Sequence, residues 1–198
     1  MAKAATKTKK SAPAKSSSKS KSSGSAGSQN TMLEKFIYDS MKDIYYAEKA
    51  VLKAMPKMKK AATTQQLKDA FTTHMEQTRG QISRLEQGFE IMGKKVQGKK
   101  CEAIEGLIAE AESIIEDTED GTMTRDVALI IAAQKLEHYE IASYGGMAQL
   151  TRTLGMDDIA ELLEQTLEEE KETDLLLTSI AENDINLQAE EEGSEEEA

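Results

Sequence analysis

The chain has 198 residues, of which 36 are acidic and 25 are basic, so its formal net charge is −11. Its single cysteine, Cys101, excludes an intrachain disulfide framework and is typical of a reducing compartment. The sequence has no run of 18 apolar residues for a membrane span and no apolar segment of a signal peptide near its start. We therefore expect a cytoplasmic protein with no membrane partner.

The two ends of the chain differ from its middle in composition. Residues 1–30 hold seven lysines and no acidic residue, and residues 188–198 hold six glutamates and no large apolar side chain. Neither stretch has an apolar period that could offset the entropy of ordering, so both are predicted to be disordered tails around a folded domain at residues 31–187. Beyond residue 30, 18 basic residues stand against 36 acidic ones. This charge repels nucleic acid and attracts cations.

The lysines of residues 1–30 have more than one interpretation. A solvated arm or an interaction tail is the first. The second is an arm that makes weak, nonspecific DNA contacts, because lysines that neutralise phosphates bind in a salt-sensitive and sequence-independent way.

Two long helical patterns come first in the folded part. In residues 32–61 the apolar residues recur three or four apart, and Pro56 is expected to kink or break the helix. Thr63 or Thr64 can cap the second helix, which extends to about Met92. Because the link is short, the two helices are predicted to pack as an antiparallel pair.

A shorter helix is expected at residues 102–117, after a basic loop. Two more long helical patterns follow, at residues 125–154 and 157–183. The connection between the second and third long helices is therefore the one long crossover, which is the ferritin-like connectivity, whereas a cytokine-type bundle has two. The sequence predicts an all-α fold: a ferritin-like four-helix bundle with a short extra helix in the crossover between helices 2 and 3.

Side chains that can bind a metal interrupt the apolar stripe of every long helix. An ionised carboxylate in an apolar core costs many kcal/mol unless a cation neutralises it or it stays protonated. Carboxylate oxygen and imidazole nitrogen are ligands that iron accepts. The pattern therefore predicts a carboxylate-rich, two-metal iron site built from Glu48, His74, Glu137, Glu140, Glu170 and Asp174.

Spacing alone leaves other interpretations of these residues open. Glutamate-rich helices produce acidic pairs by chance, so Glu170 and Asp174 could belong to a solvated face, and Glu169 replaces Glu170 if the register shifts by one. A histidine such as His74 on an apolar stripe is more often a hydrogen-bonded core residue. Tyr144 is expected in the core, where its hydroxyl group needs a partner.

Five stretches of the folded part are similar to segments of a known protein family. They are YYAEKAVLKAMPKM (45–58), HMEQTRGQISRLEQGF (74–89), CEAIEGLIAEA (101–111), AAQKLEHYEIASYG (132–145) and LGMDDIAELLEQTLEEEKETD (154–174). Through them the chain resembles the YciE/YciF family of ferritin-like proteins over about residues 32–185, and the segments EHYEIASYG and TLEEEKxTD make the resemblance specific. The resemblance implies a rubrerythrin-related bundle, a di-iron centre with ferroxidase activity, a homodimer and a stress-linked role in the bacterial cytoplasm.

The same resemblance assigns metal ligands, with one departure. The second helix of the family usually reads His-x-x-Glu-Thr, and here Gln77 stands at the position of the acid. That position offers a neutral amide oxygen or no ligand, and Glu76 lies about 100° away around the helix. The implied ligand set is Glu48, His74, Gln77, Glu137, Glu140, Glu170 and Asp174.

These observations predict a di-iron carboxylate protein that oxidises Fe(II) with dioxygen or peroxide, as a ferroxidase or a peroxide-handling oxidoreductase. Manganese and zinc are the alternative metals. The rival prediction is a non-catalytic helical stress or binding protein, DNA-associated through residues 1–30. Gln77 and the lack of a Glu-x-x-His motif favour this rival.

Overall fold

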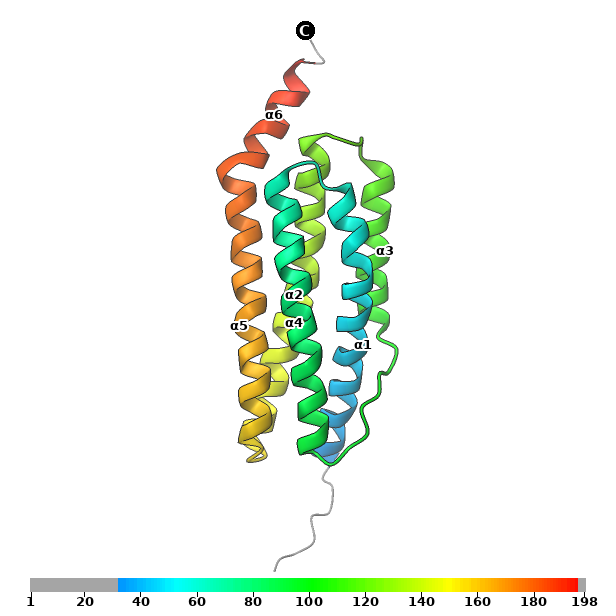
Figure 1. Ribbon diagram of the computed structural model, residues 1–198, viewed down its shortest axis with the longest axis vertical. Helices are drawn as coiled ribbons and strands as arrows, with labels where there is room; N and C mark the ends of the chain where they lie inside the picture. The colour runs from blue at the N-terminus through cyan, green and yellow to red at the C-terminus, as the bar shows by residue number, and fades with distance from the viewer. Residues whose placement is uncertain (1–31, 196–198) are drawn as a thin grey trace, which may run out of the picture. The chain divides into compact units, whose positions relative to one another are not determined.

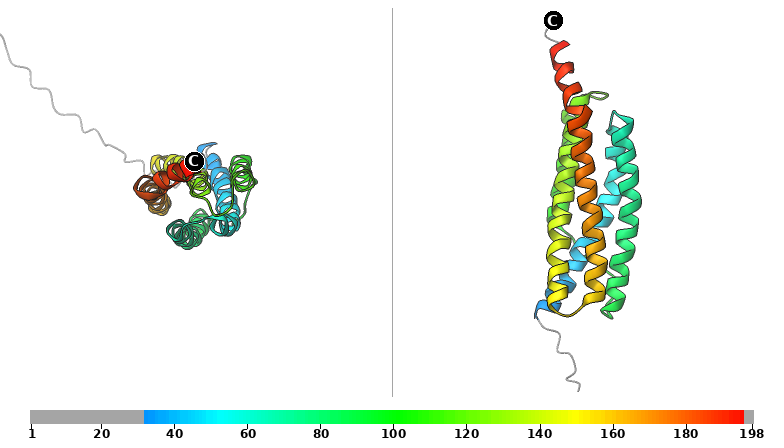
Figure 2. Two further views of the ribbon diagram at one scale, coloured as in Figure 1. Left: turned by 90° about the horizontal axis from the view of Figure 1, so that it is seen from above. Right: turned by 90° about the vertical axis from the view of Figure 1, so that its left-hand side faces the viewer.

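The computed structural model describes residues 32–195. Four long helices lie side by side in it (Figure 1): α1 (Met32–Ala61), α2 (Gln65–Ile91), α4 (Met123–Thr153) and α5 (Asp157–Ile180). Seen end-on, they surround a common interior, and α3 (Glu102–Asp117) lies outside it against α1 and α4 (Figure 2). The predicted bundle, with a short helix in its one long crossover, is confirmed.

The first two helices form the predicted antiparallel pair. The buried side chains of α1 recur three or four apart and face the interior. Pro56 lies inside α1 and is exposed, and the helix continues past it to Ala61, so Pro56 does not end the helix. Thr64 caps α2, because its Oγ1 atom accepts a hydrogen bond from the N–H group of Leu67 at 3.4 Å.

The crossover begins with a left-handed glycine. Gly93 has φ +63°, a conformation that glycine adopts readily. The N–H group of Gly93 donates to the carbonyl of Glu90, and the N–H group of Lys94 donates to the carbonyl of Phe89, both at 2.9 Å. The chain then runs along α1, where the N–H group of Lys99 donates to the carbonyl of Lys42 at 2.9 Å, before α3 begins (Figure 1). This path places α3 beside α1 and α4 and leaves the bundle interior to the four long helices.

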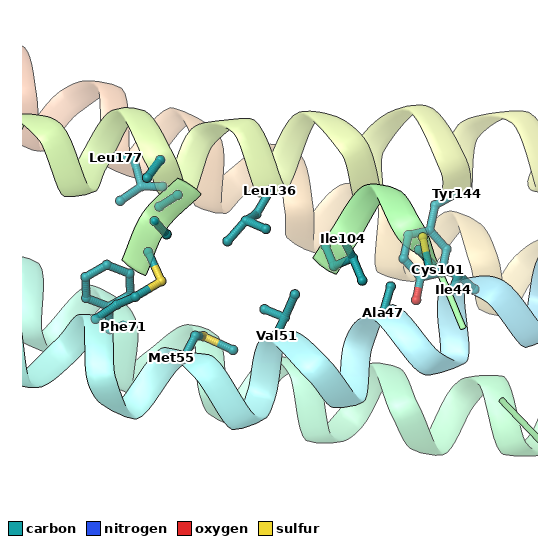
Figure 3. Packing of buried hydrophobic residues seen from close by; sticks show 14 of the residues in the cluster. Ile44, Ala47, Val51, Met55, Phe71, Cys101, Ile104, Leu136, Tyr144 and Leu177 are labelled. Atoms are coloured by element: carbon teal, nitrogen blue, oxygen red, sulfur yellow. The ribbon is translucent and has the colours of Figure 1, made fainter. Parts of the chain in front are cut away.

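The apolar core is shared by all of the helices that surround it. Figure 3 shows side chains from α1, α2, α4 and α5 directed at one another, with Ile104 and Cys101 closing the side toward α3. Full burial of one such side chain contributes about 1.5–3 kcal/mol. The labelled members include Val51, Met55, Phe71, Leu136 and Leu177.

The C-terminal region differs from the predicted disordered tail. After a π-helical turn at Ala181–Ile185, α6 (Asn186–Glu195) continues the helix, so residues 188–195 are helical. The carboxylate of Glu192 accepts hydrogen bonds from the N–H groups of Met123 at 2.8 Å and Thr124 at 3.3 Å, in the first turn of α4. A negative charge is stabilised at a helix N-terminus, and this contact gives an acidic segment a folded position.

Two further predictions concern residues 1–30 and the absence of a membrane span. The disordered tail and DNA-binding arm predicted for residues 1–30 lie outside the described residues. Within residues 32–195, every helix is too short or too polar to cross a membrane.

Candidate metal centre

The side chains that interrupt the apolar stripes meet inside the bundle. Glu48 of α1, His74 of α2, Glu137 and Glu140 of α4 and Glu170 of α5 are each at most 5% exposed. His74, Glu137, Glu140 and Glu170 each offer a ligand atom, and these four atoms all lie within 4.8 Å of one another. The Nε2 atom of His74 is 3.3 Å from Oε1 of Glu137 and 3.9 Å from Oε2 of Glu170. The solvated-face interpretation of Glu170 is therefore wrong.

Buried polar atoms without a hydrogen-bond partner concentrate at this cluster. In the described part of the chain there are eight, and seven belong to the five residues above; the eighth is Oε1 of Gln81, on the same face of α2 as His74. Folded proteins rarely leave such atoms unpaired, since each one costs roughly 1–3 kcal/mol. A bound cation would be coordinated by these oxygen and nitrogen atoms and so give each of them a partner. The residues present therefore fit a metal site. The other seven atoms are Oε2 of Glu48, Nε2 of His74, Oε2 of Glu137 and both carboxylate oxygens of Glu140 and of Glu170.

Burial and mutual repulsion set the protonation of the metal-free centre. Burial, followed by the charge of Glu170, raises the pKa values of Glu48 and Glu137 well above 4.5. Burial and the charge of Glu48 do the same for the pKa of Glu140, and burial raises the pKa of Glu170 to about 7. Without metal, Glu48, Glu137 and Glu140 therefore retain protons at neutral pH, where Glu170 is about half protonated.

His74 is held as a neutral ligand with a defined orientation. Burial lowers the pKa of the His74 imidazole to about 4. Its Nδ1 atom lies 3.4 Å from the hydroxyl oxygen of Thr173, and that hydroxyl donates its proton to the backbone carbonyl of Glu169 at 3.0 Å. The hydroxyl oxygen is thus an acceptor for an Nδ1–H group, which leaves the Nε2 lone pair directed at Glu137 and Glu170.

Glu48 is positioned by a buried tyrosine. The hydroxyl group of Tyr144, 0% exposed, donates to Oε1 of Glu48. Burial and the charge of Glu48 raise the pKa of Tyr144 far above its usual range, so the hydroxyl group stays protonated. Tyr144 thus has the hydrogen-bond partner expected for a core tyrosine, and it leaves Oε2 of Glu48 free for another ligand.

Glu169, the alternative to Glu170, faces a different partner. Its carboxylate is half-buried and forms an ion pair with the guanidinium of Arg84, and the Nε2 atom of Gln81 donates to the same oxygen at 3.2 Å. Arg84 also donates to the hydroxyl group of Thr166 at 2.9 Å. Glu169 is therefore paired directly with a guanidinium group, whereas Arg84 and the hydrogen bonds of Glu137 and Gln81 only partly offset the effect of burial on Glu170.

Two of the predicted site residues lie at the margin of the cluster. Asp174 accepts a hydrogen bond from Gln134 at 3.1 Å and lies 3.4 Å from Nε2 of His138, on the outside of the α4–α5 pair. Gln77 is half-buried, and its side-chain oxygen lies 3.4 Å from the hydroxyl group of Thr173. The structure therefore brings five predicted residues together and leaves these two beside them.

The structure also adds two residues that the sequence interpretation missed. Thr173 and Gln81 are both buried at the cluster. Gln81 is seven residues from His74, which puts the two on one helical face, so its position could have been found from spacing. Thr173 carried no such signal, because a buried threonine is common in any helix.

Comparisons with known proteins support this fold. A family model described as "Domain of unknown function (DUF892)" matches residues 31–190. Protein YciF of Escherichia coli (strain K12) is 47% identical over 164 residues, which make up 82% of this chain and 98% of that protein. The crystal structure of the E. coli stress protein YciF has a TM-score of 0.75 at 46% identity, and the match covers 79% of this chain and 98% of that one.

A second solved structure is similarly close. It is YcfI from Rhodopseudomonas palustris, which has been proposed to be a structural protein; the TM-score is 0.73 at 39% identity, over 78% of this chain and 98% of that one. Together the matches confirm the resemblance to the YciE/YciF proteins and the ferritin-like helical fold.

Proposed function

Because the chain belongs to the DUF892 family and buries an acid-rich cluster in its bundle, we propose that it is a di-iron carboxylate protein that oxidises Fe(II) with dioxygen or peroxide. The observation that carries the proposal is the set of unpaired buried oxygen and nitrogen atoms around His74 and Glu170. Five residues would hold the metals directly: Glu48, His74, Glu137, Glu140 and Glu170.

The charge of the cluster favours two metal ions. Its four carboxylates carry four negative charges when they are deprotonated, and the nearby Arg84 is already paired with Glu169. Two divalent cations would balance these charges. The donor set holds no thiolate and is rich in carboxylate oxygen, which suits iron and manganese, with zinc as a further alternative.

When bound, two ferrous ions supply one electron each, which reduces dioxygen to hydrogen peroxide, or hydrogen peroxide to two waters, with uptake of two protons in either case. The residues of this chain prepare the site for that chemistry. The carboxyl groups release their protons as the cations bind, and the Tyr144 hydroxyl group and the Thr173 hydroxyl oxygen keep Glu48 and His74 in place. The apolar core around them excludes bulk water.

The test is metal stoichiometry and turnover in one preparation. Metal-free protein is loaded anaerobically with Fe(II), and two ions per chain are expected, followed by ferric absorbance when dioxygen or peroxide is added. The Glu170→Gln variant should lose at least one ion and most of the rate. The matched control, Glu172→Gln, removes an exposed charge from the same helix and should keep both. Full stoichiometry and rate in Glu170→Gln would overturn the proposal.

The physiological setting is part of the same proposal. The E. coli relative is described as a stress protein, and removal of Fe(II) together with an oxidant is a protective reaction. We place the activity in the bacterial cytoplasm and expect a homodimer.

A non-catalytic structural or binding role is the second candidate. Gln77 supports it, because a neutral amide stands where the family resemblance implies a carboxylate. The proposal made for the R. palustris relative points the same way. This candidate predicts metal binding, or none, without oxidation of Fe(II), so the turnover measurement separates the two.

A further inference from the structure

A run of polar side chains connects the candidate metal centre to the surface between α2 and α5, two helices that pack side by side (Figure 2). We call it the α2–α5 seam. Exposure along it falls from 22% for the Glu169 side chain and 12% for that of Arg84 to 0% for Gln81 and Glu170. A cation that leaves water needs oxygen or nitrogen partners along its way, which an apolar helix contact does not supply. The seam consists of His74, Gln77, Gln81 and Arg84 of α2 and Thr166, Glu169, Glu170 and Thr173 of α5.

Gln81 joins the buried end of the seam to its exposed end. Its Nε2 atom donates to Oε2 of Glu169 at 3.2 Å. Burial raises the pKa of Glu170, and a hydrogen bond of the Gln81 side chain is one of the contacts that offset this effect, so the amide lies between the two carboxyl groups. Oε1 of Gln81 is buried and has no hydrogen-bond partner. The seam therefore holds an unused oxygen ligand between Glu169 and the centre.

Arg84 closes the exposed end of the seam. Its guanidinium forms the ion pair with Glu169, and its Nε atom donates to the hydroxyl group of Thr166 at 2.9 Å, so it ties α2 to α5. After burial, the charges of Arg84 and Glu169 are among the causes that shift the pKa values of Glu48 and Glu170, which shows that the pair is close to the centre. Partly exposed ion pairs are weak, so Glu169 can exchange the guanidinium for an arriving cation.

We propose that divalent cations enter and leave the centre through the α2–α5 seam, with the Glu169 carboxylate and Oε1 of Gln81 as transit ligands and the Arg84 guanidinium as the gate. The proposal gives Glu169 a role apart from the five residues that would hold the metals. It rests on the metal binding that the proposed function includes, and it is independent of the oxidation of Fe(II).

The first test measures the rates of metal entry and release, with Co(II) as the probe. Metal-free, full-length protein is mixed with Co(II) in a stopped-flow instrument, where visible absorbance reports binding, and excess EDTA then reports release. The double variant Arg84→Met/Glu169→Gln removes the gate and the transit carboxylate without changing the net charge. Both rate constants should fall on the order of tenfold. Their ratio, the Kd, should stay close to the natural value, because a group on the path lowers both rates alike.

An exposed ion pair on α5 supplies the matched control. Glu168 and Lys171 lie 3.5 Å apart, and Glu168→Gln/Lys171→Met removes the same two charges away from the seam. This control should keep both natural rates. Equal effects of the two double variants would overturn the proposal. Weaker binding with faster release in Arg84→Met/Glu169→Gln would also overturn it, because that result makes Glu169 part of the final site.

The second test loosens the gate and keeps its charge. Arg84→Lys retains the positive charge and the apolar stem but loses the planar fork that holds Glu169 and Thr166 together. Entry and release of Co(II) should both become severalfold faster. Arg79→Lys makes the same change at an exposed position of α2 and should alter neither rate. Unchanged rates in Arg84→Lys would overturn the role of the gate, and this single variant decides it even if the double variant does not fold.

The outcomes separate this proposal from the proposed function. Co(II) kinetics as described, without any oxidation of Fe(II), would support the path and overturn the oxidase. Oxidation of Fe(II) with unchanged Co(II) kinetics in the seam variants would do the reverse. A natural chain that binds no Co(II) would overturn both.

Discussion

Thr173 carries no charge, yet its hydroxyl oxygen determines which nitrogen of His74 faces the carboxylates. The hydroxyl proton has a short contact with the carbonyl of Glu169 at 3.0 Å and a longer one with Oε1 of Gln77 at 3.4 Å, so the oxygen can accept from Nδ1. Protein groups that orient a metal-binding histidine in this way tune metal affinity almost as strongly as the ligands do. Thr173 is thus a positioning residue.

Substitution of Thr173 tests that role. Thr173→Val keeps the shape of the side chain and removes one acceptor for Nδ1–H, so the imidazole is held less firmly in its tautomer, with Gln77 as its remaining hydrogen-bond partner. We expect metal affinity to fall about 10- to 100-fold in a chelator competition titration. Thr173→Ser retains the hydroxyl group and should keep near-natural affinity. Equal losses in the two variants would assign Thr173 to packing alone.

Glu140 offers a different kind of test, because both of its carboxylate oxygens are buried and unpaired. Glu140→Gln keeps the size of the side chain and removes a charge that repels Glu48 and Glu137. The variant should be more stable than the natural chain in chelator at pH 8, where Glu170 is largely ionised, and should bind fewer metal ions. Thermal unfolding and metal analysis measure the two effects. A variant less stable in chelator would contradict the repulsion argument.

The sequence could place Glu48 and His74 in the interior because each interrupts a period of apolar residues. It could not separate Asp174 from Thr173. Three residues from Glu170 is a rotation of −60° and four residues is +40°, so both positions lie near the same face. The choice is made by neighbouring helices, since Gln134 hydrogen-bonds to Asp174, whereas His74 pairs with Thr173. The spacing of apolar residues along one helix gives no information about such contacts between helices.

At the scale of elements, the period of apolar residues and the turn residues were sufficient to predict the bundle helices and the crossover. The region after Ile180 was not predictable in this way, because α6 has no apolar stripe to identify it. Its position is coupled to α4 through the charge of Glu192, with Ile185 buried just before it. A contact of this type depends on where another helix begins, and composition does not report that.

The capping contact of Glu192 makes a testable contribution to stability. Glu192→Gln removes the negative charge beside the free N–H groups of Met123 and Thr124, which should lower the free energy of unfolding by roughly 0.3–1 kcal/mol. Amide hydrogen exchange at those two residues should speed up as well. Glu190→Gln is the matched control, since it removes an exposed charge from the same helix. Equal effects of the two substitutions would show that Glu192 acts only through net charge.

At the scale of the whole molecule, the bundle buries several carboxyl groups side by side in its core. Only protonation or bound cations relieve the repulsion between them. The folded pKa of Glu170 is raised from 4.5 to about 7, so its contribution to stability is full below pH 4.5 and is lost as pH rises through 7. Glu48, Glu137 and Glu140 shift in the same direction. The folded pKa of His74 is lowered from 6.5 to about 4, so its contribution is full above pH 6.5 and is lost as pH falls toward 4. The two effects oppose each other below pH 6.5, and only the carboxyl groups act above it.

This balance predicts opposite pH responses with and without metal. In chelator, the Tm should fall as pH rises from 6.5 to 8.5, because folded carboxyl groups are forced to ionise. Metal binding displaces the same protons, so affinity grows with pH, and metal at 1,000 times its Kd stabilises the fold by about 4 kcal/mol. The gap in Tm between metal-loaded and metal-free protein should therefore widen over this range, as calorimetry in matched buffers would measure. In Glu140→Gln the widening should shrink, because one of the displaced protons is gone. A gap that stays constant with pH in the natural chain would mean that the buried carboxyl groups do not bind the metal.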